Sequence, residues 1–276
     1  MAPPVKRWTL KASRALLPTP ASGVRILLFH EIKPSQREVF EALIRFLLDR
    51  YGFISPEDFN RGIRTGGVRF ILSFDDGFIS QCQAARDVLD PLGIKALFFV
   101  CPRFIGLAGK EAAAFLKGPM RRPDFSEATP ELHPPSWEEL FALSQRGHQI
   151  GSHTLNHASL SALSDEETRA EEIIRSGDDL EKKLGKGIDW FAYPFGSLAN
   201  IDARSLQMVG RRYRYCCSGL RGINTDRTHR LCLTREVIDL DQPLDHLKGI
   251  ALGGFDFYYY FKQKKFFRMA GPEISN

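Results

Sequence analysis

The stretch Arg69-Phe-Ile-Leu-Ser-Phe-Asp-Asp-Gly77 guides the interpretation of the whole 276-residue chain. Its first half is apolar except for Ser73, which is typical of a strand covered on both faces. The strand leads directly into two adjacent carboxylates, Asp75 and Asp76, and a turn at Gly77. Acids at the end of a buried strand cost free energy unless a cation or a reaction uses them. Taken alone, the stretch is equally compatible with an ordinary Asp-rich turn.

The composition is that of an ordinary globular protein. Hydrophobic residues make up 43% of the chain and charged residues 26%, within the usual range for folded domains. The net charge of +5 is too small to indicate a nucleic-acid partner. The sequence has no internal repeat and no linker, so its length is best explained by one large α/β domain.

The cysteine pattern and the N-terminus predict a cytoplasmic protein. None of the five cysteines has zinc-site spacing, and the adjacent pair Cys216 and Cys217 cannot form an ordinary disulfide bond. Reduced thiols indicate a reducing compartment. The basic N-terminus has no apolar core of signal-peptide length before Pro18. No run of about 18 apolar residues follows it.

Apolar runs alternate with amphipathic segments along most of the chain, which predicts parallel strands wrapped by helices. The expected strands are residues 24–30, 69–74, 95–100, 148–151, 188–193, 213–218 and 230–235. The expected helices are residues 35–50, 56–63, 80–92, 110–116, 136–146, 164–184, 202–209 and 241–253. Ser-x-x-Glu capping boxes that begin at Ser35, Ser136 and Ser164 are expected to start three of these helices.

The second informative segment is Gly151-Ser-His-Thr-Leu-Asn-His157. Its histidines, His153 and His157, are four residues apart, so a helical turn would place both imidazoles on one face. Two histidines and one carboxylate form a common ligand set for a catalytic divalent metal. The segment follows an expected strand, as Asp75 and Asp76 do, and barrel active sites collect at the carboxyl ends of strands.

Three segments together resemble the motifs of a known family. Ser73-Phe-Asp-Asp-Gly77 is similar to the first motif of the polysaccharide deacetylases, the NodB-homology family of carbohydrate esterase family 4 type. His153-Thr-Leu-Asn-His157 is similar to the second motif and Phe191-Ala-Tyr-Pro-Phe-Gly196 to the third, in the family's order. The resemblance covers about residues 23–240. It implies a distorted (β/α) barrel of about seven strands and metal-dependent removal of an acyl group from an amino sugar.

The resemblance also implies roles for individual residues. Asp76, His153 and His157 would bind the divalent metal, with zinc as the first expectation and cobalt or nickel as alternatives. Asp75 would be the general base. The metal would polarise the acyl carbonyl and make water a stronger nucleophile, while Asp75 would remove the proton of the attacking water.

The general acid is where the sequence departs from the family pattern. The family's Leu-x-x-His motif is missing near the end of the chain, where the candidate His246 lies in an expected helix. Leu27-Leu-Phe-His30 has this pattern at the end of the first expected strand. Because a barrel closes on itself, its last strand can move to the front of the chain without changing the site. We therefore expect a circularly permuted variant with His30 as the acid. The alternative is that His30 is a structural core histidine.

The third motif departs from the family as well, because Ala192 stands where an arginine that positions the base is expected. Arg235 ends an expected strand and could reach Asp75 from another direction, either to position the base or as a structural ion pair. The neighbouring residues expected to form a wall of the substrate groove are Tyr193, Pro194 and Phe195.

Both ends of the chain are rich in basic and apolar residues. Residues 1–22 form a basic arm, residues 23–254 the expected barrel, and residues 255–276 a tail of aromatic and basic residues. This composition suits contact with an anionic membrane surface. Peripheral attachment at the inner face of a membrane is therefore one hypothesis. The other is that the aromatic residues only cover the barrel.

These features predict a metal-dependent hydrolase that removes N-acetyl groups from an amino sugar of a glycan or lipid-linked saccharide, during envelope glycan assembly. Two alternatives stay open. One is removal of a formyl or other acyl group from a related lipid-linked amino sugar, and the other is a barrel that binds glycan without catalysis. A binding module does not need a base beside a metal site, so the polar residues of the first two motifs favour an enzyme.

Overall fold

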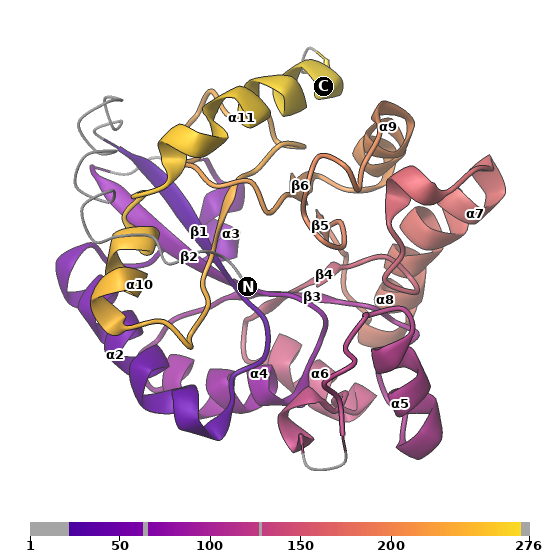
Figure 1. Cartoon of the computed structure of the whole chain (residues 1–276), viewed down its shortest axis with the longest axis horizontal. Helices are drawn as coiled ribbons and strands as arrows, with labels where there is room; N and C mark the ends of the chain where they lie inside the picture. The colour runs from indigo at the N-terminus through magenta and orange to yellow at the C-terminus, as the bar shows by residue number, and fades with distance from the viewer. Residues whose placement is uncertain (1–21, 63–65, 127–128, 272–276) are drawn as a thin grey trace.

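The computed structural model describes residues 22–62, 66–126 and 129–271. Within these residues, seven strands form one parallel sheet in the order β6-β5-β4-β3-β2-β1-β7. The strands are β1 (Gly23–Phe29), β2 (Val68–Phe74), β3 (Leu97–Val100), β4 (Gln149–Ser152), β5 (Trp190–Ala192), β6 (Tyr215–Cys217) and β7 (Arg235–Val237). The sheet curls into a nearly closed barrel with helices around its outside (Figure 1). The expected fold class, a distorted (β/α) barrel of seven strands, is confirmed.

Helices connect most of the strands and cover the outer face of the barrel. The α-helices of the described residues are α2 (Arg37–Arg50), α3 (Pro56–Asn60), α4 (Ile79–Ala84), α5 (Gly109–Lys117), α6 (Trp137–Gln145), α7 (Glu166–Ala170), α8 (Ser176–Leu184), α9 (Ala203–Arg212), α10 (Leu244–Ala251) and α11 (Asp256–Ala270). The short 3₁₀ and π-helical segments are η1 (Pro34–Gln36), η2 (Ala85–Leu89), η3 (Pro130–Leu132), η4 (Leu160–Ala162) and η5 (Glu171–Arg175). Because α7, η5 and α8 follow one another directly, they form the long helix expected over residues 164–184.

The strands are apolar throughout because both of their faces are covered. On the outer face, Phe74 stacks between Phe29 and Phe98, with ring centroids 5.5 and 4.8 Å apart. Inside the barrel, Trp190 packs with apolar side chains of the other strands. Phe59 of α3 closes the amino end, with its ring 5.5 Å from that of Trp190. The barrel interior is therefore a packed core, and chemistry is left to the carboxyl ends of the strands.

Two of the three expected capping boxes are wrong. At Ser35 the chain forms the η1 turn, and the amide oxygen of Gln36 accepts from the backbone of Lys33 at 3.0 Å. In place of Ser164 the cap is Asp165, one residue later than expected, and its side chain accepts from the backbone N–H of Thr168 at 2.7 Å. An aspartate at the cap position competes well with a serine for the first-turn amides. The box that begins at Ser136 is present as expected.

The last expected strand, residues 230–235, is also wrong in its position. Arg235 begins β7, and this strand pairs with β1 through Ile26 and Arg235. Thr234, just before it, donates its backbone N–H to the side chain of Asn224 at 2.9 Å and so leaves the strand ladder. The closing strand is shorter and later in the chain than the apolar pattern indicated.

The C-terminal tail contains α11, which packs on the barrel. Arg25 of β1 donates to both carboxylate oxygens of Asp256, at 3.1 and 2.7 Å, and so holds the start of the helix. Phe266 is buried against Tyr193, whereas Phe261 is 78% exposed. The helix therefore covers the barrel with one face and exposes aromatic rings on another.

Residues 1–21 of the expected basic arm lie outside the described residues, and the boundaries at 22 and 254 stay a prediction. In the part of the chain that the structure describes, every helix is too short or too polar to cross a bilayer.

Candidate metal-binding active site

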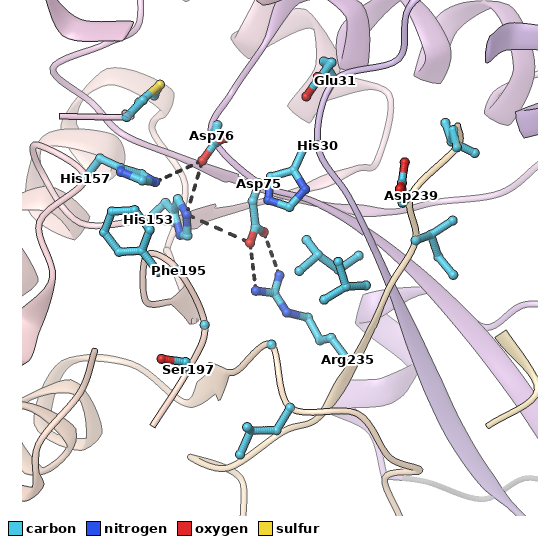
Figure 2. Close-up of a pocket in the computed structure, with 18 of the residues that line it drawn as sticks. His30, Glu31, Asp75, Asp76, His153, His157, Phe195, Ser197, Arg235 and Asp239 are labelled. Carbon is cyan, nitrogen blue, oxygen red and sulfur yellow. Dashed lines mark hydrogen bonds and ion pairs between the residues drawn. The ribbon is translucent and has the colours of Figure 1, made fainter. Parts of the chain in front are cut away.

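A cavity of about 930 Å³ opens at the carboxyl ends of the strands. Asp75 and Asp76 follow β2 and line it together with the two histidines that follow β4. Figure 2 shows Asp76 between His153 and His157, with His30 on the other side of the two aspartates. The barrel thus brings residues from separate motifs to one site, as the positions of the strand ends predicted.

Asp76, His153 and His157 form a group that fits a metal ion. One ligand atom of each residue lies within 4.8 Å of the others, and all three side chains are buried. The Nε2 atoms of His153 and His157 lie 3.5 and 3.2 Å from Oδ1 of Asp76.

The far side of each imidazole is held by the backbone. Nδ1 of His153 lies 2.7 Å from the carbonyl oxygen of Ala192, and Nδ1 of His157 lies 3.1 Å from that of Pro119. A carbonyl can only accept, so both Nδ1 atoms carry the proton and both Nε2 atoms are left with a lone pair when the rings are neutral. This is the outer-shell support that metal-ligating histidines usually have. The residues present therefore fit a divalent ion.

The expected helical turn from His153 to His157 is wrong, because the segment is a loop. Thr154 and His157 have positive φ angles of 63° and 60°, which a helix does not contain. Glu172 of η5 holds the loop: its carboxylate accepts from the backbone and side-chain amides of Asn156 at 2.9 and 2.8 Å. The π-helical segment thus presents Glu172 to the loop that carries His153 and His157, and π-bulges often occur at functional sites.

Backbone strain in the described residues is concentrated at this site. The non-glycine residues with positive φ are Asp76, Arg121, Thr154, His157 and Phe195. Three of these line the cavity. The Arg121 guanidinium lies 4.6 Å from the centre of the Phe195 ring, which itself lies 4.9 Å from that of His157. Such conformations cost about 1–3 kcal/mol each and persist where the surroundings enforce them, often at active sites.

Asp75 pairs with Arg235, as the sequence suggested. Nη1 and Nη2 of Arg235 donate to the two carboxylate oxygens at 2.6 and 2.8 Å. Arg235 also donates through Nε to the carbonyl of Ser218 at 2.8 Å, and its guanidinium lies 5.2 Å from the centre of the Phe99 ring inside the barrel. Because Arg235 and Asp75 are both buried, the pairing fixes the orientation of the carboxylate from the barrel interior.

The charges of the site favour an ionised Asp76. Burial raises the pKa of Asp76, but the hydrogen bonds that His153 and His157 donate through Nε2 in their charged forms outweigh this and hold it well below its usual value. Burial lowers the pKa of His157, but the hydrogen bond to Asp76 and its charge raise it overall. Burial lowers the pKa of Arg235, but the charge of Asp75 and the hydrogen bond to it outweigh this, so the pKa is raised overall. Asp76 is therefore ionised at neutral pH and can bind a cation.

His30 reaches the site through strand register. Phe29 of β1 pairs with Phe74 of β2, so the residues that follow, His30 and Asp75, leave the sheet at the same level. Gln81 of α4 donates to the backbone oxygen of His30 at 3.2 Å and also bonds that of Asp75, which ties the two strand ends together.

The rival acid candidate lies elsewhere. His246 is on α10, where its ring lies 6.1 Å from that of Phe255, and it is not among the residues that line the cavity. The acid role of His30 and the circular permutation both stay predictions.

Of the three expected groove residues, only Phe195 lines the cavity. Tyr193 and Pro194 are buried beneath it, and the Tyr193 hydroxyl donates to the carbonyl of Gly196 at 3.0 Å. The wall role is therefore wrong for these two residues. The positive φ of Phe195, 64°, turns its side chain outward, and local sequence gave no sign of this.

Sequence reasoning missed several cavity residues. Arg122, from the irregular stretch between β3 and α6, bonds both oxygens of Glu31 at 2.8 and 2.9 Å. The Arg121-Arg122 pair inside a long loop was the available signal. Lys262 and Lys265 line the cavity from α11, which the sequence placed in a separate tail.

Comparison with known proteins agrees with this architecture. Residues 63–213, more than half of the chain, match the family model described as polysaccharide deacetylase. The chain belongs to the polysaccharide deacetylase family. YxkH of Bacillus subtilis (strain 168), provisionally named a polysaccharide deacetylase, is 24% identical over 195 residues, which are 67% of this chain. The match spans 61% of the length of that curated relative.

Solved structures show the same barrel. The polysaccharide deacetylase BC0361 from Bacillus cereus superimposes with a TM-score of 0.64 at 19% identity, over 83% of this chain and 69% of that chain. The Streptococcus pyogenes deacetylase PplD, solved in complex with acetate, superimposes with a TM-score of 0.63 at 22% identity, over 84% of this chain and 99% of that chain. IcaB from Ammonifex degensii superimposes with a TM-score of 0.61 at 20% identity, over 86% of this chain and 99% of that chain. At these identities the likeness establishes the fold.

Proposed function

We propose that the protein is a metal-dependent hydrolase that removes the N-acetyl group from an amino sugar of a glycan or lipid-linked saccharide. The observation that carries the proposal is the pairing of Asp75 with Arg235 directly beside the group Asp76, His153 and His157. A carboxylate next to a metal-ligand set is suited to base catalysis of acyl transfer to water. Family membership supports the same chemistry.

The residues divide into a metal set and a proton-transfer set. Asp76, His153 and His157 would hold the divalent ion, with zinc as the first candidate and cobalt or nickel as alternatives. When bound, the ion supplies Lewis-acid polarisation of the acyl carbonyl and activation of water. Asp75 takes the proton of the attacking water, and the Arg235 fork holds its two oxygens in place.

His30 completes the proton balance. The amide C–N bond can break only when the leaving amine gains a proton, because an amide anion is a very poor leaving group. His30, on the other side of Asp75 from the metal ligands, donates that proton (Figure 2). The proton taken by Asp75 and the proton given by His30 leave acetate and a free amino sugar as products. The Streptococcus pyogenes deacetylase PplD was solved in complex with acetate.

Mass spectrometry of N-acetylglucosamine oligomers after incubation with the zinc-, cobalt- or nickel-loaded protein tests the proposal. We expect loss of acetyl-sized masses with at least one metal and no loss with Asp75→Asn. Loss with this variant as well would contradict the assigned base. N-formylated oligomers in parallel address the alternative deformylase. Oligomers that bind but keep their mass with every metal would favour the glycan-binding barrel.

The exposed side of α11 supports contact with a membrane surface. Phe257, Tyr258 and Phe261 are 43%, 57% and 78% exposed, on a helix that carries several basic residues after Phe261. Aromatic rings and cations together suit the headgroup region of an anionic bilayer. We propose peripheral attachment at the inner face of a membrane, where a lipid-linked saccharide would be accessible.

Flotation with vesicles that contain anionic phospholipid tests the attachment. We expect the wild type to float and a Phe257→Ser/Phe261→Ser variant to stay in the lower fraction. Vesicles of neutral phosphatidylcholine are the control for charge. If the wild-type chain does not float with anionic vesicles, attachment is excluded.

A further inference from the structure

One wall of the active-site cavity is formed by α11. Tyr259, Lys262 and Lys265 line the cavity from this helix, together with the catalytic residues on the strand ends. The three positions are spaced by three residues, so they lie along one face of the helix. The cavity wall therefore includes two lysines from a segment that the family match does not cover.

The position of this face is fixed by contacts on both sides of it. Arg25 bonds Asp256 in the first turn of α11. The side-chain amide of Gln263 bonds the backbone oxygen of Arg221, and Phe266 is fully buried in the core. Because the helix is anchored at its start and along its inner face, the fold places the backbone of Lys262 and Lys265 beside the cavity, and both side chains are exposed.

Other cations that line the cavity have carboxylate partners. Arg235 pairs with Asp75 at 2.6 Å, Arg122 with Glu31 at 2.8 Å, and Lys33 with Asp241 at 3.1 Å. Asp76 belongs to the metal-ligand group. Asp239, a further acid of the lining, accepts from the backbone of Asp241 at 3.1 Å and from Gln242 at 3.3 Å.

Lys262 and Lys265 differ from these cations. Among the described residues, no carboxylate lies within 4 Å of either ammonium group. Lys262 Nζ lies 5.2 Å from the centre of the Tyr259 ring, which leaves its hydrogen-bond donors available. Two cations on one wall of a concave, partly apolar site attract an anionic group of the ligand, because low-dielectric walls concentrate the field.

We propose that Lys262 and Lys265 form a subsite for a phosphate group of the substrate, carried as a phosphate ester or diester on the amino sugar. This inference rests on the proposed function, which places the acyl group at Asp75 and Asp76. Lysine binds phosphate as a mobile point charge with three donors. A phosphate can accept from both ammonium groups at once. The subsite selects substrates by charge, at a distance from the reacting carbonyl.

Three soluble probes test the subsite: decyl N-acetylglucosaminide, which is neutral, its decyl phosphodiester counterpart, and N-acetylglucosamine 1-phosphate. The measured quantity is the ratio of kcat/KM for each phosphate probe to that for the neutral probe. In a Lys262→Gln/Lys265→Gln variant we expect this ratio to fall at least tenfold. The matched control is Lys110→Gln/Lys117→Gln on α5, which removes two exposed charges away from the cavity and should change the ratio less than twofold.

The arms separate the sources of the phosphate. A fall confined to the decyl phosphodiester assigns the subsite to lipid-linked substrates, and a fall for both phosphate probes assigns it to phosphorylated sugars in general. An unchanged ratio in the double variant overturns the subsite. So does an equal fall in the control variant.

A binding measurement separates failure of this inference from failure of the proposed function. If the metal-loaded wild type hydrolyses none of the probes, the proposed function is contradicted. Titration calorimetry with decyl phosphate then decides the subsite separately. Binding that weakens at least tenfold in the Lys262→Gln/Lys265→Gln variant supports the subsite, and equal binding by both proteins overturns it.

Discussion

Arg235 donates hydrogen bonds through both terminal nitrogens to the two carboxylate oxygens of Asp75, at 2.6 and 2.8 Å, across 160 residues of sequence. The arginine that the third family motif would supply is absent, because Ala192 stands there. Ala192 contributes its carbonyl oxygen instead, which lies 2.7 Å from Nδ1 of His153. Asp75 and His153 are thus supported by residues of two different strands, β7 and β5.

Arg235→Lys is expected to lower kcat by roughly 10- to 100-fold. A lysine keeps the charge but cannot bond both oxygens of Asp75 in a fork. A hydrogen bond between charged groups is worth about 1.5–3 kcal/mol, which is about one to two factors of ten in rate. Steady-state kinetics on an N-acetylated oligomer, with metal content measured in parallel, checks this.

The matched control for this substitution is Arg169→Lys. Arg169 is also buried, and its Nε donates to the Ser205 hydroxyl at 3.0 Å. It is not among the residues that line the active-site cavity. We expect a lower melting temperature but less than a twofold change in kcat. If Arg235→Lys also lowers the melting temperature but changes kcat less than twofold, the role of Arg235 is structural only.

His30→Ala is expected to lower kcat on an N-acetyl sugar by about 10²–10⁴-fold, the usual contribution of a general acid. The same variant should keep most of its activity on 4-nitrophenyl acetate, because nitrophenolate leaves without a proton. The ratio of the two activities is the measurement. His246→Ala, on α10 outside the cavity lining, should leave both activities unchanged. Equal losses of His30→Ala on both substrates would argue against an acid role.

Asp76→Asn is expected to lose metal binding, while Asp75→Asn keeps it and loses activity. Asp76 contributes the carboxylate to the ligand group, whereas Asp75 is held by Arg235. Binding to the folded state alone stabilises a protein by about 2.7 kcal/mol at a free ligand concentration of 100 times Kd.

Thermal unfolding with and without zinc measures this difference. The melting temperature should rise for the wild type and Asp75→Asn and stay constant for Asp76→Asn. A rise of equal size in all three proteins would place the metal elsewhere.

The stability of the fold should decrease below neutral pH because of His148. Burial lowers the pKa of this imidazole to about 4, and its Nδ1 accepts from the backbone N–H of Ala96 at 3.1 Å. Between about pH 6.5 and 4, the unfolded chain binds a proton that the folded chain does not, so folding stability falls as the pH falls. The expected loss across this range is roughly 3 kcal/mol.

Urea unfolding at pH 7 and pH 5 checks the contribution of His148, with His148→Gln as the comparison. The wild type should lose more stability between the two pH values than the variant does. Equal losses would show that other groups dominate the acid sensitivity.

The local sequence was sufficient for the elements that depend on local physics. The run before Asp75 is apolar because both faces of β2 are covered, and this signal needs no knowledge of the partners. The residues after β2 and β4 could be assigned to one site because parallel strands end at the same edge. The spacing of His153 and His157 predicted that the two imidazoles lie together, and they do so beside Asp76. It gave the wrong backbone, because the loop conformation depends on Glu172 from a later helix.

The tertiary structure decided which distant side chains meet. Arg235 reaches Asp75, and Lys262 reaches the same cavity, only because β7 closes the barrel against β1 and α11 is anchored beside it. Tyr193 and Phe195 are two residues apart, yet one is buried and the other lines the cavity, because the chain turns through positive φ angles at Phe195 and Gly196. Periodicity and motifs report the environment of a residue along its own strand or helix. The closing of a barrel is a relation between its first and last segments, so its consequences for the site appear only in three dimensions.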